Sequence, residues 1–169
     1  MSEFNSCAKL YSPESVEAAR NVFSKSAKPF QAMMNLQNQL QLQLHERLPN
    51  NIPPSDIKTK GELIDCLDAN FDAIMDEFRE LKNAVGGMSK GEKAASAVWK
   101  SWKSDNQKLR GNYLIDMSPE DRLEMKFEFV DIMHFIMNMA TAVGLDYEEL
   151  FVLYMLKNAE NANRYNSGY

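Results

Sequence analysis

Apolar residues recur at helical spacing along most of the chain. One stripe occupies positions that share a single helix face: Leu63, Leu67, Phe71, Ile74, Phe78, Leu81 and Val85. A second stripe predicts a helix from about Pro29 to Leu48: Met33, Leu36, Leu40, Leu44 and Leu48. No segment shows the sustained alternation that is typical of β-strands. The pattern predicts an all-α fold with a helical bundle as its core.

Capping signals set the expected helix boundaries in the first half of the chain. Ser12-Pro13 offers an N-cap followed by proline at the first helical position. The proline-rich run 48–54 predicts a loop. Thr59 and Glu62 have the spacing of a capping box, and Gly86-Gly87 is expected to end the helix that follows.

Three further helix starts are expected in the second half of the chain: Ser89-Lys90-Gly91-Glu92, Ser118-Pro119-Glu120-Asp121 and Asp146-Tyr147-Glu148-Glu149. The first of these helices is expected to carry Trp99 and Trp102, and the second to last until Gly144. The segment 108–116 has no convincing period and is expected to be a loop or a mobile segment. No linker or repeat divides the sequence, which predicts one domain over residues 1–169.

Composition narrows the class of protein. Of the 169 residues, 44% are hydrophobic and 25% are charged, which is typical of a globular protein. The net charge of −5 argues against a protein that coats nucleic acid, because such proteins carry a surplus of basic residues. Two cysteines are too few for a disulfide framework and predict reduced thiols in a cytosol. We expect no signal peptide and no membrane span, because no apolar run approaches about 20 residues.

Two acidic pairs at helical spacing are candidates for chemistry: Glu77 with Glu80, and Glu128 with Asp131. Residues three apart lie on one helix face, so each pair presents two carboxylates to the same point. Both pairs border apolar stripes, and buried carboxylates are costly without a compensating cation. Four carboxylates from two facing helices would hold a hard divalent ion such as Mg²⁺. The alternative is a pair of solvated helix faces, and spacing alone leaves both interpretations open.

The C-terminal segment places basic residues on one helix face. Lys157, Asn161 and Arg164 follow the i, i+4, i+7 spacing. A lysine and an arginine that converge there could clamp phosphate oxygens, the arginine with a bidentate fork. The alternative is a basic helix end that complements the macrodipole.

Aromatic, imidazole and amide side chains are further candidates. Trp99 and Trp102 could stack on a base, or they could be packing anchors. His134 lies one turn after the second acidic pair and could contact a metal ligand, contact a base or be a satisfied core histidine. Gln37 and Gln41 share a helix face and could reach a ligand, or they could form the polar sides of their helix.

The pattern ExxE followed by ExxD in an all-helical chain resembles the all-α nucleoside triphosphate pyrophosphatase superfamily, which includes the dimeric dUTPases. Longer stretches resemble the tailed-bacteriophage dCTP pyrophosphatases (dCTPase–dUTPase): Phe4-Asn5-x-Cys7-Ala8, Gly86-Gly87-Met88-Ser89-x-Gly91-Glu92-Lys93, Ala95-Ser96-Ala97-Val98-Trp99-Lys100-x-Trp102-Lys103, Lys126-Phe127-Glu128, His134-Phe135, Met137-Asn138, Leu156-Lys157-Asn158-Ala159-Glu160-Asn161 and Gly168-Tyr169. The resemblance covers nearly the whole chain. It departs at Arg164-Tyr165, where the family usually reads Arg-Gln, and in a longer spacing between the two acidic pairs.

The resemblance implies a fold and a reaction. It implies an all-α fold with an inserted Trp-containing helix and a C-terminal phosphate-binding tail. The implied reaction is hydrolysis of dCTP or dUTP to the monophosphate and pyrophosphate, with Mg²⁺ held by Glu77, Glu80, Glu128 and Asp131. Glu77 would accept the proton of the attacking water. Such an enzyme would control the deoxynucleotide pool in the cytoplasm of the infected cell, as a homodimer that could associate with other nucleotide-synthesis enzymes.

The resemblance also implies roles in binding. The terminal phosphates would be neutralised by Lys157, Arg164 and Tyr169, and the base and sugar would contact Gln37, Trp102, His134 and Asn161. We hypothesise that an amide at Gln37 or Asn161 flips to match cytosine or uracil, because it carries both a donor and an acceptor. Two alternatives remain open. The first is a dUTPase proper or a MazG-like hydrolase of another nucleotide, and the second is a non-catalytic helical protein that binds nucleotide or another protein.

Overall fold

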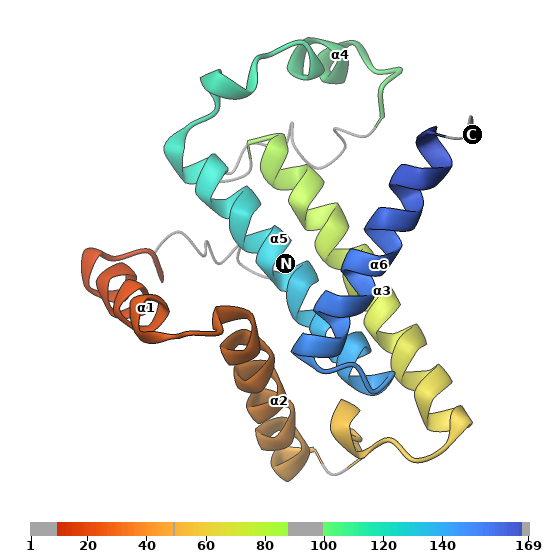
Figure 1. Ribbon diagram of the computed structural model, residues 1–169. Coiled ribbons are helices and arrows are strands. Elements are labelled where there is room, and N and C mark those ends of the chain that lie inside the picture. Colours follow the sequence, from red (N-terminus) through yellow and green to blue (C-terminus); the bar gives the residue numbers. More distant parts are fainter. Residues whose placement is uncertain (1–9, 49, 88–99, 167–169) are drawn as a thin grey trace. The chain divides into compact units, whose positions relative to one another are not determined.

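The computed structural model describes residues 10–48, 50–87 and 100–166 (Figure 1). The helices over these ranges are α1 (Pro13–Lys25), α2 (Pro29–Arg47), α3 (Lys60–Val85), α4 (Ser104–Arg110), α5 (Pro119–Ala142) and α6 (Tyr147–Asn166), with the short 3-10 helices η2 (Pro54–Asp56) and η5 (Leu114–Asp116). The described residues contain no β-strand. The prediction of an all-α fold is therefore confirmed.

The first two predicted caps form as expected. The Ser12 Oγ accepts a hydrogen bond from the backbone N–H of Ser15 at 3.1 Å, at the start of α1. At the start of α3 the Glu62 N–H donates to Thr59 Oγ1 at 3.2 Å, and the Thr59 N–H donates to Glu62 Oε2 at 2.9 Å. This reciprocal pair is a capping box, which satisfies backbone donors that have no partner inside the helix.

The starts of α5 and α6 use the same device. Ser118 Oγ accepts from the backbone N–H of Asp121 at 3.0 Å. Asp146 Oδ1 accepts from the backbone N–H groups of Glu148 and Glu149, both at 2.8 Å. Each side-chain oxygen satisfies donors of the first helical turn, so the predicted boundaries are confirmed to within a residue or two.

Glycine ends both long helices. Gly87 follows α3 with φ +91°, and Gly144 follows α5 with φ +83°. A left-handed backbone of this kind costs an L side chain steric strain that glycine avoids. The sequence therefore specifies where α3 and α5 stop, and so fixes the length of the two helices that carry the acidic pairs.

The segment around Trp102 differs from the prediction. Trp102 lies in a turn rather than in a helix, and α4 begins only at Ser104, after an extended Lys103 (φ −86°, ψ 133°). Serine favours a helix start over a helix interior because its side chain competes for backbone hydrogen bonds. The expected loop 108–116 is also partly wrong, since residues 108–110 close α4 and Leu114–Asp116 form η5. The helix start expected at 89–92 and Trp99 lie outside the described residues.

The chain divides into two compact units, each assembled from two stretches of sequence. One unit comprises Met1–Lys25 and Phe71–Phe135, and the other comprises Ser26–Asn70 and Ile136–Tyr169. The helices α3 and α5 contribute residues to both. In the second unit α2 contacts both α6 and η2. Lys28 Nζ, just before α2, donates to the Tyr147 hydroxyl at 2.6 Å at the start of α6.

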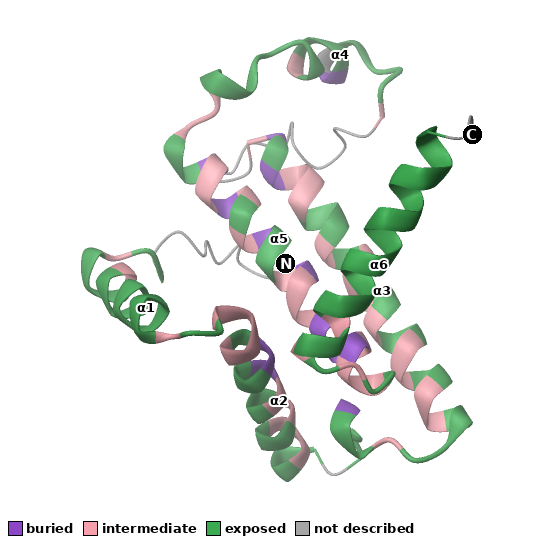
Figure 2. Cartoon of the chain, viewed as in Figure 1, coloured by how far each residue is buried: buried purple, intermediate pink, exposed green. Residues whose placement is uncertain are grey.

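The burial pattern shows which helix faces lack cover (Figure 2). The second predicted stripe is largely exposed, at Met33, Leu36, Leu40 and Leu48, whereas the buried positions of α2 are Met34 and Gln37. Every apolar residue of α6 from Phe151 to Leu156 is also exposed. Periodicity identifies an apolar face but not the surface that covers it. Despite this apolar area, none of the described helices is long and apolar enough to cross a membrane.

Candidate metal centre

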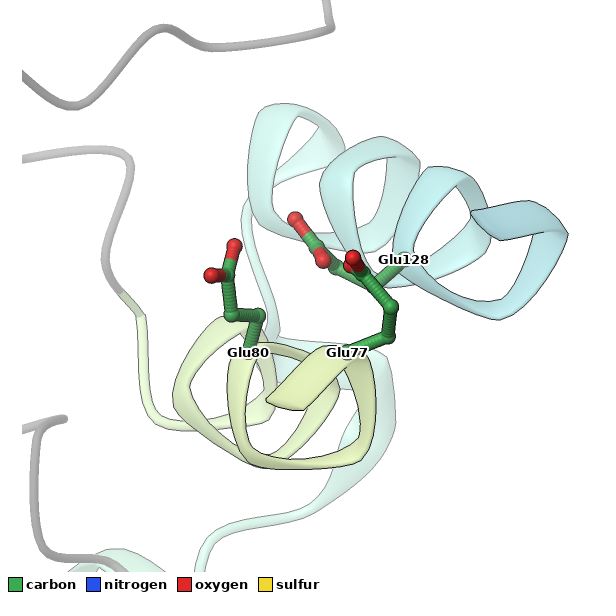
Figure 3. A group of neighbouring side chains, drawn as sticks. All are labelled: Glu77, Glu80 and Glu128. Atoms are coloured by element: carbon green, nitrogen blue, oxygen red, sulfur yellow. The ribbon is translucent and has the colours of Figure 1, made fainter. Parts of the chain in front are cut away.

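Three glutamates from two helices converge on one point (Figure 3). Glu77 and Glu80 extend from α3, and Glu128 extends from α5. One carboxylate oxygen from each residue lies within 4.8 Å of the others. We call these three residues the acidic cluster. The spacing of three residues explains why Glu77 and Glu80 leave α3 on the same side.

The members of the acidic cluster differ in burial. The side of α5 that carries Glu128 is covered, and only 6% of this residue is exposed. Glu77 is half-buried and Glu80 is exposed. Within the described residues, no hydrogen bond or ion pair reaches any of the three carboxylates. A buried carboxylate without a partner is destabilising, so the cluster requires either protons or a cation.

The electrostatics of the acidic cluster agree with this argument. Burial raises the pKa of Glu128 from 4.5 to about 7, and the neighbouring negative charges of Glu80 and Glu77 contribute further. Burial also raises the pKa of Glu77, with Glu80 and then Asp131 as the next causes. Both shifts have the sign expected when desolvation and like charges disfavour the ionised form. A cation placed among these oxygens would reverse both effects.

Asp131, the fourth predicted carboxylate, lies beside the cluster rather than within it. Its Oδ1 is 3.4 Å from His134 Nδ1, one turn later on α5. Its charge still raises the pKa of both Glu77 and Glu128, so it lies close to them. The structure thus brings three of the four predicted carboxylates together, whereas Asp131 lies beside His134.

Sequence reasoning missed one acidic residue near the cluster. Glu124 lies four residues before Glu128 on α5 and is only 2% exposed. Its negative charge is among the causes that raise the pKa of Glu128. The spacing of four residues was a usable signal, because i and i+4 positions share a helix face. With Glu128 and Asp131, Glu124 is thus a third carboxylate on this side of α5.

The donor set fits a hard divalent cation. All three ligand atoms of the acidic cluster are carboxylate oxygens, which Mg²⁺ and Ca²⁺ prefer over nitrogen or sulfur. Among the described residues, no histidine or cysteine joins the three glutamates, so nothing in the group favours a softer metal such as zinc. Mg²⁺ usually keeps phosphate and water ligands beside one or two carboxylates.

The other predicted site residues fall on several elements. Gln37 is buried on α2, and its Nε2 donates to Asn138 Oδ1 at 2.8 Å. Trp102 is 67% exposed in its turn. Exposed positions of α6 hold Lys157, Asn161 and Arg164, and Arg164 Nε donates to Glu160 Oε1 at 2.9 Å. Tyr169 lies outside the described residues.

A large cavity adjoins the end of α3 in the first unit. Its volume is about 930 Å³, and its lining includes Lys82, Gly87, Arg110 and Asp121. This volume is in the range of small-molecule sites. Its charged lining residues are two basic and two acidic side chains: Lys82, Arg110, Asp116 and Asp121. Neither Lys82 nor Arg110 was among the residues predicted from the sequence.

Two curated relatives align with the chain from end to end. One is a dCTP pyrophosphatase of Enterobacteria phage LZ5, 44% identical over 174 residues, with 100% of both chains covered. The other is a dCTP pyrophosphatase of Enterobacteria phage T4, 42% identical over 173 residues, again with 100% of both chains covered. A DNA replication protein of phage T4 is 41% identical over 167 residues, which cover 96% of this chain and 42% of that longer protein.

The helices and the acidic cluster define the class: an all-helical protein whose two longest helices bring acidic side chains together. On the full-length relatives, the chain belongs to the phage dCTP pyrophosphatase family. The resemblance inferred from the sequence is therefore confirmed. No family model matches the chain, and no solved structure matches it.

Proposed function

We propose that this protein hydrolyses dCTP, and also dUTP, to the nucleoside monophosphate and pyrophosphate in a Mg²⁺-dependent reaction. The observation that carries this proposal is the acidic cluster, in a chain that aligns end to end with proteins named dCTP pyrophosphatase. The dUTP activity and the choice of Mg²⁺ follow from the resemblance of the sequence to dual-specificity enzymes. The whole chain, residues 1–169, would act as one enzymatic domain.

The acidic cluster would hold the metal, with Asp131 as a further ligand or neighbour. When bound, Mg²⁺ neutralises phosphate oxygens and lowers the pKa of a coordinated water. Glu128 would lose its proton as the ion enters, because its pKa of about 7 lies close to neutral pH. The burial of Glu128 would strengthen its electrostatic contact with the ion.

Glu77 would act as the general base. Its carboxylate accepts a proton from the attacking water while the water oxygen forms a bond to the α-phosphorus. The bond from that phosphorus to the bridging oxygen breaks, and pyrophosphate leaves with that oxygen. This role follows from the resemblance to dimeric dUTPases, and Glu77 lies beside Glu80 and Glu128, where the metal would be held.

The remaining predicted residues would bind the substrate. Lys157, Arg164 and Tyr169 would neutralise the terminal phosphates, as cationic clamps do in other phosphoryl transfers. The base and sugar would contact Gln37, Trp102, His134 and Asn161. Lys157 and Arg164 both lie at exposed positions of α6, and Arg164 Nε donates to Glu160 Oε1.

The protein would act as a homodimer in the cytoplasm of the infected cell, where it could associate with other nucleotide-synthesis enzymes. The apolar surface of α6 supports self-association. Its exposed residues are Phe151, Val152, Leu153, Tyr154, Met155 and Leu156. So many exposed apolar residues on one helix are uncommon in a monomer. Sedimentation of wild type and of Leu153→Glu would test it, since a dimer is expected to dissociate when a charge enters the interface.

The reaction is tested by incubating purified protein with each deoxy- and ribonucleoside triphosphate, with Mg²⁺ and with a chelator. We expect dCMP and dUMP together with pyrophosphate, only when metal is present. Glu128→Gln is expected to abolish the products. Glu120→Gln is the matched control, because Glu120 is exposed in the first turn of the same helix and should leave turnover unchanged.

Other outcomes discriminate the alternatives. Turnover of dUTP alone would indicate a dUTPase proper, and turnover of a different triphosphate would indicate a MazG-like specificity. Inorganic phosphate in place of pyrophosphate would rule out attack at the α-phosphorus. If dCTP and dUTP stay intact with Mg²⁺, the protein is a binding protein rather than this enzyme.

A further inference from the structure

Three side-chain amides form a hydrogen-bonded network inside the second unit. Gln37 Nε2 on α2 donates to Asn138 Oδ1 on α5 at 2.8 Å. Asn138 Nδ2 donates to Asn70 Oδ1 on α3 at 3.1 Å. Asn70 Nδ2 then donates to the backbone carbonyl oxygen of Cys66 at 2.7 Å. We call Gln37, Asn138 and Asn70 the amide network.

The backbone carbonyl at the end of the network fixes its direction. A carbonyl oxygen can only accept, so Asn70 must face Cys66 with its nitrogen. The oxygen of Asn70 is then turned to Asn138, which must offer its own nitrogen. Asn138 consequently offers its oxygen to Gln37, which must answer with Nε2. Reversing any one amide would bring two acceptors or two donors together.

Burial makes the direction of the network expensive to reverse. Gln37 is 6% exposed and Asn138 is 5% exposed, so water cannot readily replace a lost partner. A buried polar group that loses its hydrogen bond bears its full desolvation cost. The free flip of Gln37 that the sequence suggested is therefore opposed by the two amides behind it.

The network leaves one acceptor of Gln37 available. Its side chain makes the single hydrogen bond through Nε2, and no described donor reaches Oε1. Among the described residues, the fully enclosed side-chain polar atom that has no hydrogen-bond partner is Asn38 Oδ1. Gln37 Oε1 also has no partner among them but is not fully enclosed, so part of its surface is accessible. The protein thus presents an oriented amide with a carbonyl oxygen free and one nitrogen hydrogen still unused.

We infer that the amide network makes Gln37 select cytosine over uracil. This inference rests on the proposed function and on Gln37 as the base contact. Cytosine offers an amino group at C4 and an acceptor at N3, and these match Oε1 and the unused Nε2 hydrogen. Uracil offers a carbonyl at C4 and a donor at N3, so both positions mismatch. Asn138 and Asn70 are positioning residues in this selection. The enzyme then uses dUTP, but with a lower kcat/KM than dCTP.

Asn70→Leu tests the inference in the full-length protein. This change removes the acceptor of Asn138 and the link to the Cys66 carbonyl, so Asn138 and Gln37 are free to reverse. The ratio of kcat/KM for dCTP to kcat/KM for dUTP is expected to fall roughly fivefold or more. Asn70→Asp keeps an acceptor that faces Asn138 and is expected to keep the wild-type ratio. A merely structural role would lower both activities together and leave the ratio unchanged.

A second measurement separates this inference from the proposed reaction. We expect the wild type to bind dCMP at least fivefold more tightly than dUMP in calorimetry, a result that does not depend on turnover or on the folding of any variant. Normal dCTP turnover with an unchanged ratio in Asn70→Leu would overturn the inference alone. Absent turnover with a dCMP preference would overturn the proposed reaction alone. Equal or undetectable binding of dCMP and dUMP would overturn the inference in either case.

Discussion

The acidic cluster and the amide network treat buried polar groups in opposite ways. The cluster brings Glu77, Glu80 and Glu128 together with no described hydrogen bond or ion pair to their carboxylates. The network satisfies each amide with a neighbour and ends at a backbone carbonyl. The carboxylates of the acidic cluster therefore need protons or an added cation, whereas the three amides are hydrogen-bonded to one another, with Gln37 Oε1 and one Nε2 hydrogen unused among the described residues.

This difference determines how each region responds to its surroundings. The free energy of the acidic cluster depends on pH and on metal, because its members carry like charges and Glu128 has a pKa of about 7. The amide network has no titratable group, so its contribution should not change with either. The unpaired carboxylates of the acidic cluster thus provide a binding site, and the hydrogen bonds of the amide network fix the orientation of the amides.

Glu128→Gln is expected to have the largest effect. It removes the buried ligand of the cluster, and turnover should fall at least about a hundredfold. Its effect on stability without metal should have the opposite sign. At pH 8 the wild type carries a buried charge that glutamine lacks, so the variant should be more stable than the wild type. Urea denaturation in chelator measures this change, and equal stability at pH 8 would mean that Glu128 is not destabilised by burial.

Asn138→Leu is expected to have the next largest effect. It leaves Gln37 Nε2 and Asn70 Oδ1 without a partner, and the free energy of unfolding should fall by about 2 kcal/mol. The loss should be the same at pH 6 and pH 8, with Mg²⁺ or with chelator. Asn38→Leu is the matched control, because the enclosed Asn38 Oδ1 has no hydrogen-bond partner to lose. A pH-dependent loss in Asn138→Leu would show that the stability of the amide network depends on pH, as that of the acidic cluster does.

The two regions also differ in how far the sequence predicts them. The acidic pairs could be found because i and i+3 residues share a helix face, which needs no knowledge of tertiary structure. The approach of Glu128 to Glu77 and Glu80 followed from the expectation that the two helices with acidic pairs face each other. The spacing allowed His134 to contact Asp131 but could not choose this contact over the alternatives, because rotamers on one helix face depend on packing.

The amide network was invisible in the sequence. Gln37 and Asn138 are 101 residues apart, and Asn138 and Asn70 are 68 residues apart. Asparagine has no periodic signature, and contacts at such separation depend on how helices pack. The same limit explains α2, whose periodicity was correctly interpreted as helical although its apolar stripe is exposed. Local signals such as the Thr59–Glu62 capping box were reliable because both partners lie within one turn.

The dependence of Mg²⁺ binding on pH is a smaller effect that sharpens the comparison. Because the folded pKa of Glu128 is raised, its contribution to stability without metal is greatest below about pH 4.5 and is lost as the pH rises through about 7. Mg²⁺ must displace that proton below pH 7, so the apparent affinity should be about tenfold weaker at pH 6 than at pH 8. Calorimetric titration measures both values. Glu128→Gln should remove this dependence, and an equal affinity in the wild type would place the metal elsewhere.

His134→Ala is expected to have the smallest effect, because its contact is intermediate between the two regions. Asp131 has a partner, unlike the acidic cluster, but that partner is weak: the distance is 3.4 Å and both side chains are about 40% exposed (43% and 40%). Exposed pairs of this kind contribute less than about 1 kcal/mol, because water screens them. The free energy of unfolding should therefore change by about 0.5 kcal/mol or less in urea denaturation. A loss above about 1 kcal/mol would show that the pair stabilises α5 as a buried contact would, whereas a raised KM at unchanged stability would support a role for His134 in binding the base.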